Sequence, residues 1–189
     1  MKMYKNDYAI DIETLGNSRA NLPAIVVIGA VAFDRESGKI QRELHVQIDL
    51  VSAVKSGHVD GETLTFWFSQ PNAQQAMTRG ARVHLNDALL ALSSFVTPGD
   101  SRIWSWGSDF DVRILGGAFE QSLLMEWPWD YRATRDARTY CTELAEQFGI
   151  VLPIQSPIGK HNALMDARHC AHLVSGVHQQ MMVLSEACA

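Results

Sequence analysis

Hydrophobic and polar positions along the chain predict three strands within its first 50 residues. Residues Tyr8 to Ile12 predict a first strand, and Ala24 to Phe33, apolar apart from Gly29, predict a second strand buried on both faces. A polar turn over residues 34–39 leads into Gln41 to Leu50, where apolar and polar residues alternate as in a half-buried third strand. We expect these three strands to form an antiparallel meander.

The rest of the chain predicts helices interrupted by two further strands. The expected elements are helices over Glu62–Phe68 and Asn72–Arg79, a helix over Asp87–Val96 capped by Asn86, a fourth strand over Arg102–Trp106 leading into a helix from about Ser108, a short fifth strand over Tyr131–Thr134, a helix that begins after Asp136 and ends at Gly149, and a last helix from about Asn162. This order predicts an α/β fold in which helices flank a mixed five-stranded sheet whose first three strands are antiparallel.

Length and composition indicate one globular domain over residues 1–189, because 47% of the 189 residues are hydrophobic and no internal repeat is present. Cys141, Cys170 and Cys188 form no CxxC pair, which argues against a disulfide framework and a zinc-thiolate site. The longest apolar run is far shorter than the about 20 residues that span a bilayer, and the first residues lack an apolar signal core. We therefore expect a cytoplasmic protein that does not enter a membrane.

The net charge of −5 argues against a protein that coats long stretches of nucleic acid, since such proteins are usually basic. Binding of a strand end is still compatible with this charge, because bound metal ions offset an acidic centre. Arg132, Arg135 and Arg138 form the densest basic stretch. They either hold phosphates or form a solvated helix end.

Acidic residues follow two of the predicted strands. Asp11 and Glu13 are two apart on the first strand, so their side chains point to the same face. Asp111 lies just past the fourth strand, near the start of a helix, where Asp109 competes with it for any functional role. Each acid also has a simpler interpretation, as part of a solvated strand end or as a helix-start residue.

His161 and Asp166 lie five residues apart, too far to share one helix face. They converge if His161 lies at the end of a loop over residues 153–160 and Asp166 in the first turn of the helix that Asn162 caps. The alternative is a surface histidine beside a helix-start aspartate. Acids from such distant positions are costly to bring together unless cations neutralise them, and oxygen ligands suit magnesium or manganese.

The three motifs together resemble those of a known enzyme family. Asp-x-Glu on a first strand, Phe110-Asp111 after a later strand, and His-x₄-Asp before the last helix occur in the order typical of DEDDh (DnaQ-like) 3′-5′ exonucleases. Within that family, residues 11–17 and 106–111 look closest to the branch of phage DNA exonucleases and mycobacterial-type 3′-5′ exoribonucleases. The resemblance covers about residues 8–177 and implies a ribonuclease H-like fold.

The resemblance implies a metal-dependent 3′-5′ exonuclease that releases 5′-mononucleotides from DNA or RNA. Two divalent cations, Mg²⁺ or Mn²⁺, would drive phosphodiester hydrolysis, with His161 as the general base. The ligands that the resemblance implies are Asp11, Glu13, Asp111 and Asp166. The alternative is a ribonuclease H-like module that binds nucleic acid or protein without cutting it.

The same resemblance suggests where a strand would bind. Thr14, Leu15 and Gly16 follow the first strand, where the family usually contacts the terminal nucleotide, and Trp67 offers an aromatic face for stacking or belongs to the core. The expected partner is the 3′ end of a single strand or overhang. Several relatives are homodimers, so a homodimer is possible here.

Overall fold

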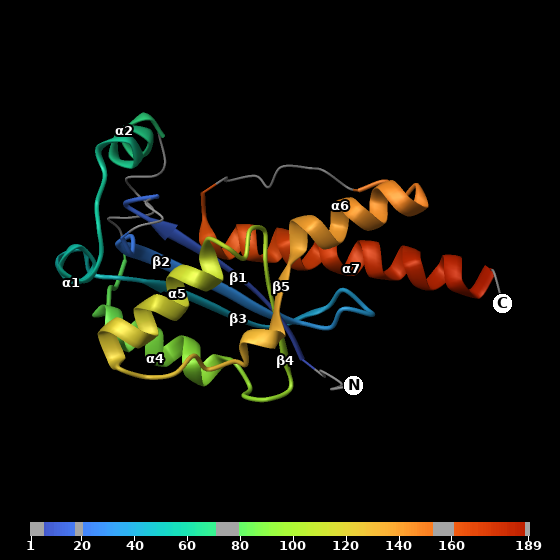
Figure 1. Cartoon of the computed structure of the whole chain (residues 1–189), viewed down its shortest axis with the longest axis horizontal. Coiled ribbons are helices and arrows are strands. Elements are labelled where there is room, and N and C mark those ends of the chain that lie inside the picture. Colours follow the sequence, from blue (N-terminus) through green and yellow to red (C-terminus); the bar gives the residue numbers. More distant parts are fainter. Residues whose placement is uncertain (1–5, 18–20, 71–79, 153–160, 188–189) are drawn as a thin grey trace.

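The computed structural model describes residues 6–17, 21–70, 80–152 and 161–187 (Figure 1). The helix expected over 72–79 and the loop expected over 153–160 therefore lie outside the described residues. No described helix is long and apolar enough to cross a membrane.

A single mixed sheet organises the described part of the chain. Its strands are β1 (Asn6–Thr14), β2 (Ile25–Phe33), β3 (Ile40–Gln47), β4 (Ser101–Ser105) and β5 (Thr134–Asp136). The strand order is β3-β2-β1-β4-β5, with β1–β2 and β2–β3 antiparallel and β1–β4 and β4–β5 parallel. The predicted five-stranded mixed sheet, with its first three strands antiparallel, is confirmed.

Two strand boundaries predicted from the sequence are wrong. The third strand ends at Gln47 rather than Leu50, because the Asp49 carboxylate accepts a hydrogen bond from the Ser52 N–H at 3.0 Å and starts the unpredicted helix α1 (Leu50–Ser56). The expected fifth strand begins late: residues 131–133 form a 3₁₀ turn, and pairing with β4 starts at Thr134.

The described helices otherwise follow the sequence pattern closely. They are α2 (Gly61–Ser69), α4 (Leu85–Phe95), α5 (Asp111–Ala118) with a π-helical turn over Phe119–Leu123, α6 (Ala137–Phe148) and α7 (Ala163–Ala187). Asp136 caps α6 and Gly149 ends it, as predicted. The predicted cap of α4 is wrong, since the His84 ring, and not Asn86, accepts the N–H of the first turn.

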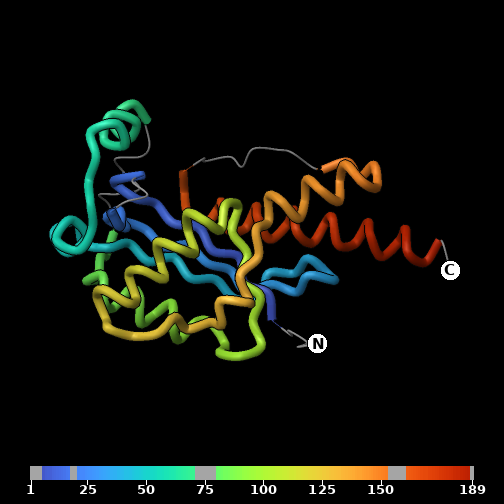
Figure 2. The backbone as a smooth tube through the Cα atoms, in the orientation of Figure 1, coloured from blue at the N-terminus to red at the C-terminus, as the bar shows by residue number. Residues whose placement is uncertain are grey.

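The helices cover both faces of the sheet (Figures 1 and 2). Tyr8, Ile10 and Ile12 of β1 face a core shared with α4 and α5, whereas Ala9 belongs to a second core shared with α6 and α7. This alternation along β1 follows from the two-residue period of a strand. It directs the side chains of Asp11 and Glu13 to the face on which α7 lies.

Candidate active site

Asp11 and Glu13 lie in the second half of β1, on the α7 face of the sheet. Both residues belong to the strand, and the burial of Glu13 contradicts the interpretation of this residue as part of a solvated strand end. Glu13 is only 8% exposed, and its Oε1 is buried without a hydrogen-bond partner among the described residues. A buried, unpartnered carboxylate oxygen is costly unless a cation binds it.

Gly29 of β2 allows α7 to reach these acids. It is the register partner of Asp11, and a Cβ atom placed on Gly29 would lie 2.2 Å from the backbone carbon of Ala163, the first residue of α7. Only glycine tolerates so close an approach of two backbones. Gly29, the one interruption of the apolar run, was the sequence signal for this contact, and its role was not predicted.

The start of α7 carries His161 and Asp166 to the same face. The Asp166 carboxylate accepts hydrogen bonds from the backbone N–H groups of His161 at 3.1 Å and Asn162 at 3.2 Å. The Asn162 side chain accepts from the Met165 N–H at 3.2 Å, as expected for an N-cap. His161 therefore precedes the helix and Asp166 lies in its first turn, the arrangement expected from their spacing.

His161 has a constrained backbone and a ring held by aromatic neighbours. Its φ of 67° lies in the left-handed region, which is rare for a residue with a side chain. The imidazole packs edge-to-face against Phe66 and Trp67 of α2, with ring centroids 4.8 and 5.8 Å away. These contacts fix the orientation of the imidazole. The role of Phe66 was not foreseen from the sequence.

Asp111 begins α5 and reaches back to β1. Its Oδ2 accepts from the Ser105 hydroxyl and its Oδ1 from the Ile12 N–H at 3.3 Å. Parallel pairing of β1 with β4 ends at Ala9, so the Asp111 carboxylate takes over the N–H that a longer β4 would have bonded. Asp109, the competing acid, is not among the described residues that line the cavity.

The four acids and His161 line one cavity of about 330 Å³. Within it, carboxylate oxygens of Asp11, Glu13 and Asp166 lie within 4.8 Å of one another. Asp111 lines the same cavity but directs its oxygens to Ser105 and Ile12. The structure thus gathers residues from β1, α5 and α7 that are up to 155 positions apart in the sequence.

The electrostatics of the cavity favour a bound cation. Burial, followed by repulsion from Asp166 and Asp111, raises the pKa of Glu13 to about 8. Burial and the other three acids raise the pKa of Asp11 well above its usual range. Burial raises the pKa of Asp111 to about 6 despite hydrogen bonds from Ser105 and Ile12. Several carboxylates that resist ionisation side by side form a donor set that fits divalent metal ions.

The predicted substrate-binding residues lie beside the cavity rather than among its described lining. The Thr14 hydroxyl donates to the Gly16 carbonyl at 2.7 Å, and Leu15 is buried. Trp67 is 4% exposed and its indole N–H donates to the Thr14 carbonyl at 2.8 Å, so α2 is tied to the end of β1. The most exposed aromatic of this helix is Phe68, at 71%.

The three arginines of the basic stretch have separate surroundings. Arg138 lines the cavity that holds the four acids and donates to the Trp106 carbonyl at 2.7 Å. Arg135 donates to two carbonyl groups of its own segment, and Arg132 stacks on Tyr131. Their different surroundings were not predictable from their spacing, because the segment that carries them includes a 3₁₀ turn, a strand and a helix start.

The fold of this chain is similar to that of solved exonuclease structures. A zinc-bound form of E. coli exonuclease I in complex with single-stranded DNA matches with a TM-score of 0.71 at 13% identity, covering 98% of this chain and 43% of that one. The nuclease domain of 3′hExo, a DEDDh family member bound to rAMP, matches with a TM-score of 0.58 at 14% identity, covering 94% and 93%. The chain thus spans less than half of exonuclease I, and these likenesses show the fold.

A match between the sequence of this chain and a family model shows the family to which the chain belongs. The model of the 3′-5′ exoribonuclease Rv2179c-like domain matches residues 6–178, so the chain belongs to this family. The membership predicted from the motifs is confirmed. A search of curated proteins found no match to this chain.

Proposed function

We propose that this chain is a metal-dependent 3′-5′ exonuclease. The observation that carries the proposal is the cluster of Asp11, Glu13 and Asp166, whose oxygens lie within 4.8 Å of one another in a chain of the exoribonuclease family. The buried, unpartnered Glu13 Oε1 supports it, because a structural role would leave that oxygen without compensation. Four acids around one cavity also disfavour a module that binds without cutting.

Asp11, Glu13 and Asp166, joined by Asp111, would hold two divalent cations, and magnesium or manganese suits an all-oxygen donor set. Such ions stabilise the charge that develops on the attacking and leaving oxygens of a phosphodiester. Each Asp111 oxygen accepts one hydrogen bond and keeps a second lone pair with which it could bind a cation.

His161 is the proposed general base. Its ring lines the cavity and is oriented by Phe66 and Trp67, and imidazole accepts a proton readily near neutral pH. It would take the proton of the attacking water while the bond from phosphorus to the 3′-oxygen of the preceding nucleotide breaks. The products are a 5′-mononucleotide and a strand shortened by one residue with a free 3′-hydroxyl.

Arg138 is the proposed phosphate contact of this site. It is the only arginine or lysine among the described residues that line the cavity, and its guanidinium has donors beyond the one used by Trp106. Thr14, Leu15, Gly16 and Trp67 stay candidates for positioning the terminal nucleotide, with the buried Trp67 acting through the β1 end that it holds. A homodimer and a cytoplasmic location rest on the sequence alone and stay predictions.

RNA is the proposed substrate, because the family is described as one of exoribonucleases. Matched RNA and DNA oligomers, single-stranded or with a 3′ overhang and labelled at the 5′ end, test this with Mg²⁺, Mn²⁺ or EDTA. We expect stepwise shortening from the 3′ end that EDTA stops and that is faster on RNA. Cleavage of a circular strand would instead identify an endonuclease.

A further inference from the structure

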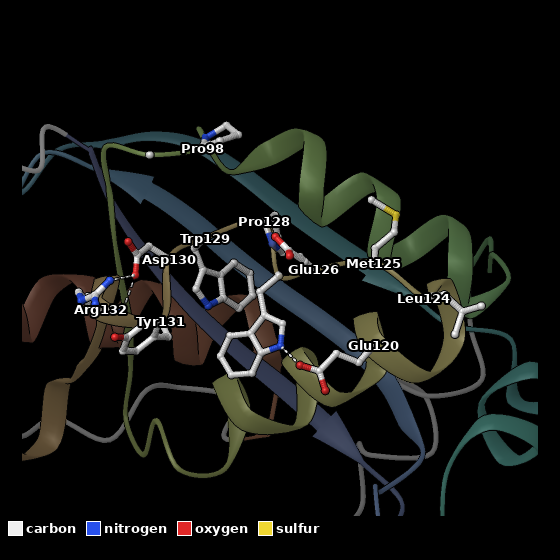
Figure 3. Close-up of a pocket in the computed structure, with 12 residues that line it drawn as sticks. Pro98, Glu120, Leu124, Met125, Glu126, Pro128, Trp129, Asp130, Tyr131 and Arg132 are labelled. Carbon is white, nitrogen blue, oxygen red and sulfur yellow. Dashed lines mark hydrogen bonds and ion pairs between the residues drawn. The ribbon is translucent and has the colours of Figure 1, made fainter.

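A second hollow lies at the opposite end of the sheet from the acids. A groove of about 870 Å³ is lined by Pro98 and Gly99, just before β4, by Glu120 and by the segment from Leu124 to Arg132 (Figure 3). The acids lie at the carboxyl end of β1 and after β4, whereas this groove adjoins the amino end of β4. The two hollows have no described lining residue in common, so the groove is separate from the proposed active site.

Aromatic rings form the floor of this groove. Trp127 and Trp129 pack edge-to-face, with ring centroids 6.1 Å apart. Trp127 packs on α5 so closely that a Cβ atom on Gly116 would lie 2.1 Å from its ring, and its N–H donates to Glu120 at 2.7 Å. The indole is therefore held in place while remaining partly open to solvent. Fixed aromatic faces bind cations and apolar groups at little entropic cost.

The charge of the groove is negative. Glu120, Glu126 and Asp130 line it, against the single guanidinium of Arg132. Arg132 shows how the groove holds a guanidinium, because it lies 4.5 Å from the Tyr131 ring centroid and 3.8 Å from the Asp130 carboxylate. Glu126 and Trp127 both line the groove and Glu126 is exposed, so a ring and a carboxylate are available there to a second guanidinium.

The rim of the groove presents apolar side chains outward. Leu124 is 89% exposed and has a φ of 52°, a left-handed conformation that is unfavourable for leucine. It follows a π-helical turn, a feature common at functional sites. Met125 beside it is also exposed. A strained backbone that exposes a leucine next to an aromatic groove indicates a surface that another molecule covers.

We propose that this groove binds an arginine-containing peptide segment of a partner protein. An arginine of the segment stacks on Trp127 and pairs with Glu126, and an apolar neighbour covers Leu124. A nucleic-acid strand does not suit the groove, since three carboxylates repel phosphate. Occupation of the groove leaves nucleotide hydrolysis unchanged in rate, because the catalytic cavity lies at the other end of the sheet.

The probes that test the proposal are two fluorescein-labelled decapeptides of arginine, leucine and serine, one of them with glutamate in place of every arginine. Fluorescence anisotropy is measured with the full chain and Mg²⁺ at physiological salt. We expect saturable binding of the arginine peptide, weakened about tenfold or more by Glu126→Lys and by Trp127→Ala. Glu146→Lys, on the exposed face of α6, makes the same charge change away from the groove and should leave binding within about twofold.

Several outcomes would overturn the proposal. These are absence of saturation, equal binding of the glutamate peptide, equal weakening by Glu126→Lys and Glu146→Lys, and binding of a ten-nucleotide single strand that Trp127→Ala abolishes. Because Glu126 is exposed, its substitution tests the groove even if Trp127→Ala fails to fold. Glu126→Lys should also hydrolyse the oligonucleotide at the wild-type rate, which separates failure of this proposal from failure of the proposed nuclease activity.

Discussion

Replacement of Glu13 by glutamine should stabilise the metal-free protein while removing its response to metal. Glutamine keeps the size of the side chain and removes the charge that burial, Asp166 and Asp111 disfavour. The pKa of Glu13 rises from 4.5 in the unfolded chain to about 8 in the folded one. A folded-state pKa above the unfolded value means that the carboxyl stabilises the fold fully below pH 4.5, and that this contribution is lost as the pH rises through about 8.

The magnitude follows from about 1.4 kcal/mol for each pKa unit. At pH 8 the free energy of unfolding of the wild-type chain is lower by at most about 4 kcal/mol than that of a chain whose residue 13 is always neutral. The same repulsion raises the pKa of Asp11, so the measured effect is shared and we expect about 2 kcal/mol. In a domain of this size that corresponds to an increase in Tm of about 4–8 °C.

Urea unfolding in EDTA at pH 5 and pH 8 measures this difference. Glu13→Gln should exceed the wild type in free energy of unfolding at pH 8, and exceed it by far less at pH 5, which lies just above the unfolded-state pKa of Glu13. Addition of Mg²⁺ at pH 8 should then stabilise the wild type but not the variant. Glu146→Gln, on an exposed helix face, is the control and should change neither value. A Glu13→Gln protein that is less stable than the wild type at pH 8 without metal would refute the electrostatic argument.

Three further substitutions test individual parts of the site. His161→Ala should lower kcat about 100-fold or more and leave the Mg²⁺ concentration for half-maximal stabilisation unchanged, and an unaltered rate at pH 7.5 would assign the base elsewhere. Gly29→Ala should cost several kcal/mol of stability and most of the activity, because its methyl group would overlap the Ala163 backbone; unchanged urea unfolding would contradict that contact. Arg138→Gln should raise KM for an oligonucleotide about tenfold. Lys55→Gln removes the same charge at an exposed position and should leave KM unchanged. Equal increases in KM for the two variants would mean that Arg138 acts only through long-range charge and does not contact phosphate.

The alternation of apolar and polar residues and their helical spacing were sufficient to predict most of the sheet. A strand forms where the pattern allows one of its faces to be buried. These patterns failed where a short-range cap competed with them. Residues up to Leu50 continue the alternation of β3, but the Asp49 cap begins a helix there. The spacing of apolar residues does not show whether a capping hydrogen bond at a helix start stabilises the chain more than one further pair of hydrogen bonds between strands.

The acids and the histidine were predictable because their order and spacing are characteristic, but their supports were not. The supports are the hydroxyl group of Ser105, the ring of Phe66 and the missing side chain of Gly29. Serine, phenylalanine and glycine are common in any sequence. Their roles depend on contacts between segments distant in sequence. Gly29 was the most accessible of them, since a glycine inside a buried strand often marks the close approach of another backbone.

The most direct test of the account is the release of 5′-mononucleotides from a 5′-labelled RNA oligomer by the wild-type chain and by Asp11→Asn. With Mg²⁺ or Mn²⁺ the wild type should shorten the strand one nucleotide at a time from its 3′ end. Asp11→Asn, with the same circular dichroism spectrum, should release nothing above background, because asparagine removes charge from the centre of the cation site. Release by Asp11→Asn at the wild-type rate, or release that continues in EDTA, would contradict the proposed metal-dependent reaction.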